Sequence, residues 1–139
     1  MADETSDETL REILTRTRRI ALVGASLDGA RPSNRVGHYL VSRGLNVVPV
    51  NPLAVGETLF GKTVIANLAE AGPVDMVDIF RRSEAVPGIV EDALAIDGLK
   101  TIWMQLGVRH PEAASAARAA GLTVVQDRCP AIEIPRLGL

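Results

Sequence analysis

The sequence has few of the residues from which several classes of protein are built. One of its 139 residues is cysteine and two are histidine, which excludes an intrachain disulfide and argues against a zinc site. The net charge of −2 argues against a general binder of nucleic acid or membrane surfaces. No apolar run reaches the ~20 residues of a membrane span, and the acidic N-terminus does not resemble a signal peptide. We therefore expect a cytoplasmic protein.

Aromatic residues are also scarce, at 3% of a chain that is 47% hydrophobic. The core is therefore expected to consist of Val, Ile, Leu and Ala. A chain of this length suits one domain and can bury roughly 70% of its unfolded surface. We assign residues 1–17 to an N-terminal tail and a short helix, begun by a capping box at Thr5-x-x-Glu8. Residues 18–139 are assigned to the domain itself.

The most informative stretch is the apolar run Ile20–Val23, followed by Gly24-Ala25-Ser26. Four apolar residues are too few for a helix but suit a strand buried on both faces of a parallel sheet. The small residues after it allow a sharp turn that a phosphate could approach closely. A helix is predicted from about Ser33, which completes the strand–loop–helix unit of a nucleotide-binding fold.

Strands and helices alternate along the rest of the chain. Strands are predicted at 46–50, 75–80, 100–104 and 123–125, and a short edge strand within the loop 53–67. This alternation predicts an α/β fold, with a mostly parallel sheet covered by helices on both faces in a single Rossmann-like three-layer domain. If the edge strand is the third, the expected order is 3-2-1-4-5-6.

The helices between these strands have recognisable start and stop residues. Ser33 or Asn34, Ser83 and His110 are predicted N-caps, and Gly44, Gly98 and Gly121 are predicted stops. Inward-facing residues are predicted to be Val36, Leu40 and Val41 in the first of these helices, and Val86, Ile89, Val90, Ala93 and Leu94 in the second.

Ligands of such sheets bind beyond the carboxyl ends of the strands. The segments expected there are Gly24–Ser26, Asn51-Pro52, Phe80–Arg82, Gln105–Gly107 and Asp127–Cys129. They contain no Ser-His-Asp order, no paired carboxylates and no cluster of metal ligands. No catalytic residue is predicted. His38 and His110 are interpreted as structural, and Trp103 as a core residue.

The first loop departs from the dinucleotide fingerprint. It keeps Gly24 and Gly29 but has Ser26 at the position of the second glycine. Asn51 ends the second strand, where an NAD-binding domain has the Asp or Glu that binds the ribose. The sequence therefore disfavours NAD without excluding it.

Five segments together resemble a known family. They are Val23-Gly24-Ala25-Ser26, Val48-Pro49-Val50-Asn51-Pro52, Val77-Asp78-Ile79-Phe80-Arg81-Arg82, Trp103-x-Gln105-x-Gly107 and Asp127-Arg128-Cys129. In this order and spacing they resemble the small stand-alone CoA-binding proteins, whose domain is similar to the CoA-binding domain of the succinyl-CoA synthetase alpha subunit. The resemblance covers about residues 18–137. It implies coenzyme A with its pyrophosphate at Gly24–Ser26, nucleotide contacts around Val50–Pro52 and Phe80–Arg82, and Gln105–Gly107 on the opposite wall.

Coenzyme A also needs cations, because it carries a pyrophosphate and a 3′-phosphate. Arg31, Arg35, Arg81 and Arg82 are candidates, since the guanidinium fork suits phosphate. Phe80 or Pro52 could flank the adenine. The predicted cofactor-binding residues are Gly24, Ala25, Ser26, Arg31, Arg35, Val50, Asn51, Pro52, Phe80, Arg81, Arg82, Gln105 and Gly107.

Two functions from different classes remain open at this point. The first is a non-catalytic module that holds coenzyme A or an acyl-CoA, as a carrier, a sensor or the partner of another enzyme. The alternative is an NAD(P)-dependent oxidoreductase or a CoA-dependent transferase on a minimal Rossmann domain. Cys129 also has two interpretations: a small buried hydrophobe, or a thiol that forms a mixed disulfide with the coenzyme.

Overall fold

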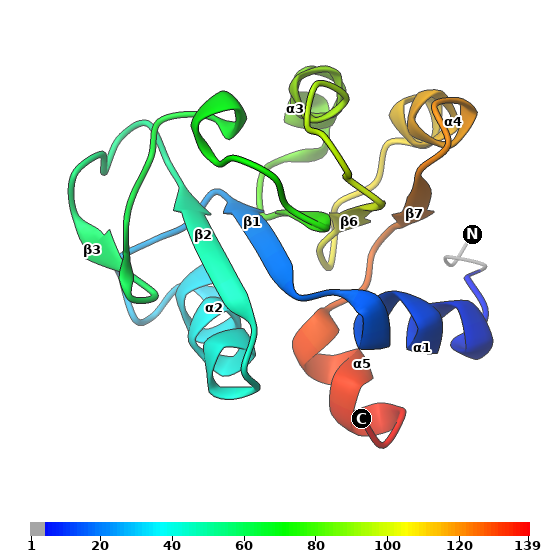
Figure 1. Cartoon of the computed structure of the whole chain (residues 1–139), viewed down its shortest axis with the longest axis horizontal. Coiled ribbons are helices and arrows are strands. Elements are labelled where there is room, and N and C mark those ends of the chain that lie inside the picture. The colour runs from blue at the N-terminus through cyan, green and yellow to red at the C-terminus, as the bar shows by residue number, and fades with distance from the viewer. Residues whose placement is uncertain (1–4) are drawn as a thin grey trace.

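The molecule is built around a parallel five-stranded sheet (Figure 1). The structure, a computed structural model, describes residues 5–139; residues 1–4 of the predicted tail lie outside the described part. The sheet order is β2-β1-β5-β6-β7. Its strands are β1 (Arg19–Val23), β2 (Asn46–Val50), β5 (Met76–Ile79), β6 (Thr101–Met104) and β7 (Thr123–Val125). The predicted α/β class and the predicted strand order are thereby confirmed for these five strands.

Helices cover both faces of this sheet (Figure 1). One face carries the 3-10 turn η1 (Leu68–Glu70), α3 (Val86–Ala93) and α4 (Pro111–Ala119). The other carries α1 (Asp7–Arg16), α2 (Pro32–Ser42) and α5 (Pro130–Arg136). A second 3-10 turn, η2 (Ser83–Ala85), leads into α3.

Strand residues alternate between two apolar clusters, one on each face of the sheet. In β1, Ala21 and Val23 belong to the α3/α4 cluster, whereas Ile20 and Leu22 belong to the α1/α2/α5 cluster. Such double burial explains why these strands read as unbroken apolar runs. Asp78 in β5 is the exception, since it is fully buried and pairs in register with Leu22 and Trp103.

The predicted third strand differs from the structure. Its segment forms a separate antiparallel hairpin of β3 (Thr58–Leu59) and β4 (Lys62–Thr63). Only one bridge, Val50 to Ile65, connects this segment to the edge of the main sheet. Gly61 and Phe60 both adopt positive φ at the hairpin tip, so the chain turns back before a longer edge strand can form.

Several predicted helix details are wrong. Ser6, not Thr5, caps α1, because its hydroxyl accepts from the Thr9 amide. Helix α2 has Arg31 at its N-cap and Pro32 at its first position, so neither Ser33 nor Asn34 is the cap. Proline is favourable there because its missing N–H would have no partner in a first turn.

Three further predictions, for Ser83, Val41 and Leu94, are also wrong. Ser83 opens η2, and its hydroxyl accepts from the Arg109 amide instead of capping α3. Val41 and Leu94 are exposed, although they were predicted to face inward. His110 does cap α4 as predicted, with Nδ1 accepting from the Ala113 amide.

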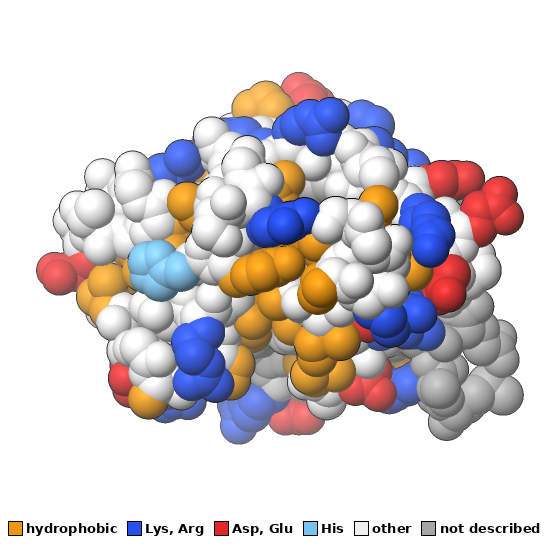
Figure 2. Space-filling view, turned by 90° about the horizontal axis from the view of Figure 1, so that it is seen from below, with side chains coloured by type: hydrophobic (Ala, Val, Ile, Leu, Met, Phe, Trp, Pro, Cys, Tyr) orange, Lys and Arg blue, Asp and Glu red, His pale blue; other side chains and the backbone are white. Residues whose placement is uncertain are grey.

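The face that carries α1, α2 and α5 is partly apolar on its outside. Figure 2 shows hydrophobic side chains gathered near the middle of this face, with Lys and Arg side chains around them. Val41 of α2 and Ile132 of α5 are among the exposed large hydrophobic residues. None of the helices that the structure describes has the length and apolarity needed to cross a membrane.

Candidate binding cleft

A cleft of about 780 Å³ lies at the carboxyl edge of the sheet. The loops that follow β1, β2, β5 and β6 line it, together with the N-terminal end of α2. This is where open parallel sheets bind ligands, next to the point at which the strand order reverses, here between β1 and β5. The lining residues are Gly24, Ala25, Ser26, Arg31, Pro32, Ser33, Asn51, Pro52, Leu53, Phe80, Arg81, Arg82, Gln105, Leu106 and Val108.

The turn after β1 requires glycine at position 24. Gly24 has a φ of +88°, and a Cβ added to it would stand 2.6 Å from the Phe80 carbonyl oxygen. The amides of Gly24 and Ala25 both donate to the Val50 carbonyl, at 3.0 and 3.3 Å. These two amides are therefore engaged within the protein, which leaves anion binding at this turn to the donors that follow them.

Two asparagines hold the carbonyls of the same turn. Asn51 Nδ2 donates to the Ala25 oxygen at 2.7 Å, and Asn34 Nδ2 donates to the Ser26 oxygen at 2.9 Å. The Ser26 hydroxyl in turn accepts from the Asp28 amide at 3.1 Å. Asn51, which follows β2, and Asn34, in the first turn of α2, thus fix the conformation of this loop.

Positive charge surrounds this turn. Helix α2 points its N-terminal end at the cleft, where the helix dipole favours an anion. Pro32 has no N–H and the Asn34 amide donates to the Arg31 carbonyl at 3.1 Å, so the Ser33 amide is the donor that the first turn can offer. Arg31, Arg81 and Arg82 also line the cleft. The Arg81 stem lies over the turn, with its Cδ 3.1 Å from the position that a Gly24 Cβ would take.

The wall formed after β6 is held by its backbone and by Asp127. The Gln105 amide donates to the Ile79 oxygen at 3.2 Å, and the Gln105 carbonyl accepts from Val108 at 2.8 Å. The Gly107 amide donates to Asp127 Oδ1 at 2.7 Å. Asp127 has a positive φ of 56°, a conformation that short polar side chains tolerate better than most. The wall is therefore fixed before any ligand arrives.

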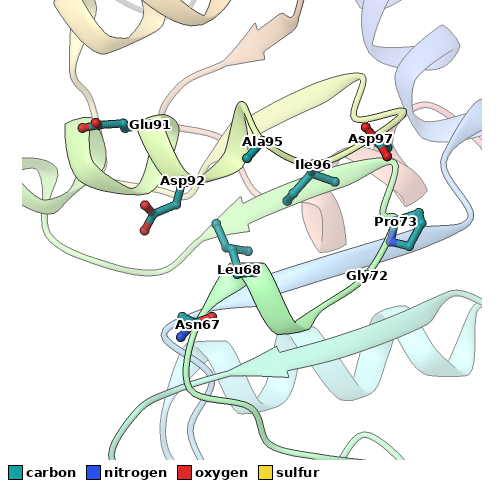
Figure 3. Close-up of a pocket in the computed structure, with 10 residues that line it drawn as sticks. Asn67, Leu68, Gly72, Pro73, Glu91, Asp92, Ala95, Ile96 and Asp97 are labelled. Atoms are coloured by element: carbon teal, nitrogen blue, oxygen red, sulfur yellow. The ribbon is translucent and has the colours of Figure 1, made fainter.

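A second hollow, of about 740 Å³, lies between η1, the end of α3 and the chain entering β5. Figure 3 shows Asp92 and Asp97 on its α3 side, with Asn67 and Pro73 opposite. Its charged lining residues are Glu91, Asp92 and Asp97, all acidic. Such a lining repels phosphate, so the carboxyl-edge cleft is the candidate site for a nucleotide.

Comparison with known proteins agrees with this geometry. Residues 18–135 match the model of a family described as CoA binding domain. The chain belongs to the CoA-binding domain family. A Bacillus subtilis relative of this CoA-binding domain, YneT, is 38% identical over 125 residues, which cover 89% of this chain and 90% of YneT.

Solved structures of similar chains have the same fold as this CoA-binding domain. A protein of Thermus thermophilus has a TM-score of 0.90 and 40% identity, covering 96% of this chain and 99% of its own. A hypothetical protein of Pyrococcus horikoshii has a TM-score of 0.89 and 37% identity, covering 96% of this chain and 93% of its own.

Most of the predicted cofactor-binding residues line the cleft of this CoA-binding domain, but three do not. Arg35 Nη1 donates to the Ala30 carbonyl and holds the loop before α2. Val50 is buried and uses its carbonyl to fix the Gly24 turn. Gly107 is engaged with Asp127. The lining residues absent from the list of predicted residues are Pro32, Ser33, Leu53, Leu106 and Val108, each within two positions of a predicted one.

Cys129 is buried in the α1/α2/α5 cluster and is the N-cap residue of α5. It is not among the residues that line the cleft, so the structure favours the interpretation as a small buried hydrophobe. Within residues 5–139, no group of three or more His, Cys, Asp or Glu side chains could hold a metal ion.

Proposed function

We propose that the carboxyl-edge cleft binds coenzyme A or an acyl-CoA, and that the domain acts as a carrier, a sensor or the partner module of another enzyme. The family match supports a CoA-type ligand. The observation that carries the proposal is the meeting of the α2 N-terminus with three arginines in one cleft. A diphosphate with a separate 3′-phosphate requires several positive groups at different positions, and this cleft supplies them.

The strand order suggests how the ligand lies. In nucleotide-binding βαβ units the diphosphate binds at the first turn and the ribose near the end of the second strand. By this rule the adenosine lies toward Asn51 and Pro52, with the exposed Leu53 beside the base. The pantetheine arm then runs in the opposite direction, across the β5 loop toward Gln105 and Leu106.

The chemistry of the lining supports binding rather than catalysis. Among the residues that line the cleft, within the described part of the chain, there is no His, Cys, Lys, Asp or Glu. These are the usual general acids and bases, so the two serines of the lining, Ser26 and Ser33, have no base among the lining residues to activate them. The lining offers phosphate-binding cations, amides and apolar surface, which suit holding a ligand.

Calorimetric titration of the full chain with coenzyme A, dephospho-coenzyme A, NAD and NADP tests the proposal. We expect coenzyme A to bind most tightly, and its dephospho form to bind more weakly because the contact with the 3′-phosphate is lost. NAD or NADP binding more tightly than coenzyme A would favour the oxidoreductase alternative. No binding of either CoA form would contradict the proposal.

Arginine variants test which cations take part. Arg81→Ala and Arg82→Ala should each weaken coenzyme A binding about tenfold, as expected for a charge-assisted hydrogen bond worth ~1.5 kcal/mol. The loss should be larger at low salt than at high salt. Arg11→Ala, on helix α1 away from the cleft lining, is the matched control and should bind as the wild type does. Unchanged affinity in both variants would remove Arg81 and Arg82 from the site.

A further inference from the structure

The side-chain oxygen of Gln105, a residue of the cleft lining, has no hydrogen-bond partner within the described chain. Gln105 is 5% exposed, and its Oε1 accepts no hydrogen bond from any residue between 5 and 139. A buried acceptor left unsatisfied costs roughly 1–3 kcal/mol, and such atoms are rare in folded proteins. Because Gln105 also lines the cleft, the missing donor can come from a ligand.

The backbone that carries the Gln105 side chain is fixed in place. Its backbone is held on both sides, by donation to Ile79 and by acceptance from Val108. The next turn of the same wall is tied to Asp127 through the Gly107 amide. The backbone of Gln105 is therefore held at one place on the cleft wall, and its side chain is enclosed by its surroundings; such preorganisation favours selection of one donor group of a ligand.

The position of Gln105 indicates which donor this is. Gln105 follows β6, which is two strands from β1 in the sheet, or about 10 Å from the phosphate-binding turn. The adenosine is assigned to the other side of that turn, at the β2 end. The part of coenzyme A that extends toward β6 is the pantetheine arm, and this arm carries two amide N–H groups.

We propose that Gln105 is a specificity-determining residue whose Oε1 accepts a hydrogen bond from a pantetheine amide N–H. The cleft thereby distinguishes coenzyme A from nucleotides with the same phosphates but no arm. This inference rests on the proposed function. It places the thiol end of the arm beyond Gln105, beside Leu106, which is 55% exposed.

The test compares two ligands and three proteins by calorimetry. The ligands are coenzyme A and 3′-phospho-ADP, which keeps the adenine and the phosphates but has no pantetheine. Gln105→Met keeps the size of the side chain and removes the acceptor. Gln126→Met is the matched control, because Gln126 is another buried glutamine, outside the cleft lining, whose Oε1 accepts from the His110 amide.

We expect wild-type protein to bind coenzyme A at least tenfold more tightly than 3′-phospho-ADP. In Gln105→Met, affinity for coenzyme A should fall about tenfold while affinity for 3′-phospho-ADP stays unchanged. Gln126→Met should keep the wild-type ratio of the two affinities. Equal loss for both ligands in Gln105→Met would assign the contact to the part that they share, and unchanged affinity for coenzyme A would remove the contact altogether; either result would overturn the inference.

The wild-type comparison keeps the inference falsifiable even if Gln105→Met does not fold. Equal affinity of the wild-type protein for the two ligands would overturn the role of Gln105 and leave the proposed function standing. Absence of binding by both ligands would instead overturn the proposed function itself.

Discussion

A side chain at Gly24 is excluded for two reasons, the positive φ of its backbone and the lack of room for a Cβ. At Gly44 only the first reason applies. Gly24 has a φ of +88° and no room for a Cβ, whereas Gly44 has a φ of +86° and nothing within 4 Å of an added Cβ. Gly44→Ala should therefore cost only the backbone strain, about 1 kcal/mol. Gly24→Ala should cost about 2 kcal/mol more, because the Phe80 carbonyl must move.

Urea unfolding of Gly24→Ala and Gly44→Ala measures this difference directly, since the two positions have nearly the same φ, +88° and +86°. The Gly24 variant should also bind coenzyme A more weakly, because the turn it distorts forms part of the cleft. Equal stability of the two variants would show that the Phe80 carbonyl yields without cost.

Asp78 is a carboxyl group buried in an apolar layer. Both of its oxygens are without a hydrogen-bond partner among the described residues, and burial raises the pKa of Asp78 well above its ordinary value of 3.8. The folded protein therefore keeps the proton at pH values where the unfolded chain has lost it. The contribution of Asp78 to the free energy of unfolding falls as pH rises from about 4 toward the raised pKa, by about 1.4 kcal/mol per pH unit.

Asp78→Asn should remove this contribution. The unfolding free energy of the wild type minus that of the variant, measured by urea denaturation from pH 4 to 8, should decrease as pH rises.

Asp75 provides a control of opposite sign. Burial acts to raise the pKa of Asp75, but hydrogen bonds from the Arg19 and Arg18 amides outweigh it and lower this pKa. Asp75→Asn should therefore cost most stability above pH 4. A difference for Asp78 that is constant with pH would contradict its buried neutral form.

Helix α5 contains a network of ion pairs around Glu133. This buried carboxylate accepts from Arg128 at 3.1 Å and from Arg136 at 2.7 Å. Arg136 also pairs with Asp7 of α1 at 2.8 Å. Glu133→Ala should destabilise the protein by about 2 kcal/mol, because it leaves two arginines without their shared partner.

Glu84→Ala is the matched control for that change. Glu84 pairs with Arg82 at 4.0 Å on the surface, with both side chains exposed, and such pairs contribute less than ~1 kcal/mol. Thermal denaturation should show a clear loss for the Glu133 variant and little change for the Glu84 variant. Similar losses in both would mean that α5 does not depend on Glu133.

The same helix shows where local sequence patterns stop being informative. Strands such as 46–50 and 123–125 could be predicted to the residue because apolar, β-branched runs end at clear turn residues. Helix α5 was not predicted at all. It spans only seven residues and has Pro135 inside it, which argues against a helix, although Pro130 at its first position is favourable. Ile134 packs in the α1/α2/α5 cluster, and Arg136 pairs with Asp7, 129 residues away in sequence.

At the level of the molecule, ligand binding should add to global stability. Coenzyme A at ~100 times its dissociation constant contributes about 2.7 kcal/mol if it binds only the folded state. For a domain of this size the melting temperature should rise by about 10 °C. Differential scanning fluorimetry measures the shift, and Arg81→Ala should show a smaller one at the same ligand concentration. An unchanged melting temperature would contradict binding to the folded state.

The location of the cleft was predictable, because the carboxyl ends of parallel strands must meet at one edge. Five segments were named from the sequence; those after β1, β2, β5 and β6 line one cleft, whereas Asp127–Cys129, after β7, does not line it. What sequence patterns could not predict is which polar atoms the fold uses internally. The amides of Gly24 and Ala25 are engaged with Val50, whereas Gln105 Oε1 is unengaged. Both depend on packing between segments far apart in the chain.

Trp103 is the chain's single tryptophan, is fully buried, and donates its indole N–H to the Arg128 carbonyl at 2.8 Å. It lies in β6 and precedes Gln105, the first residue after that strand, by two positions. An indole shielded from water emits at shorter wavelength than a hydrated one, so the protein contains its own optical reporter. Its emission should shift to the red on unfolding, and changes in its intensity on titration give a label-free signal from the strand that ends at the cleft.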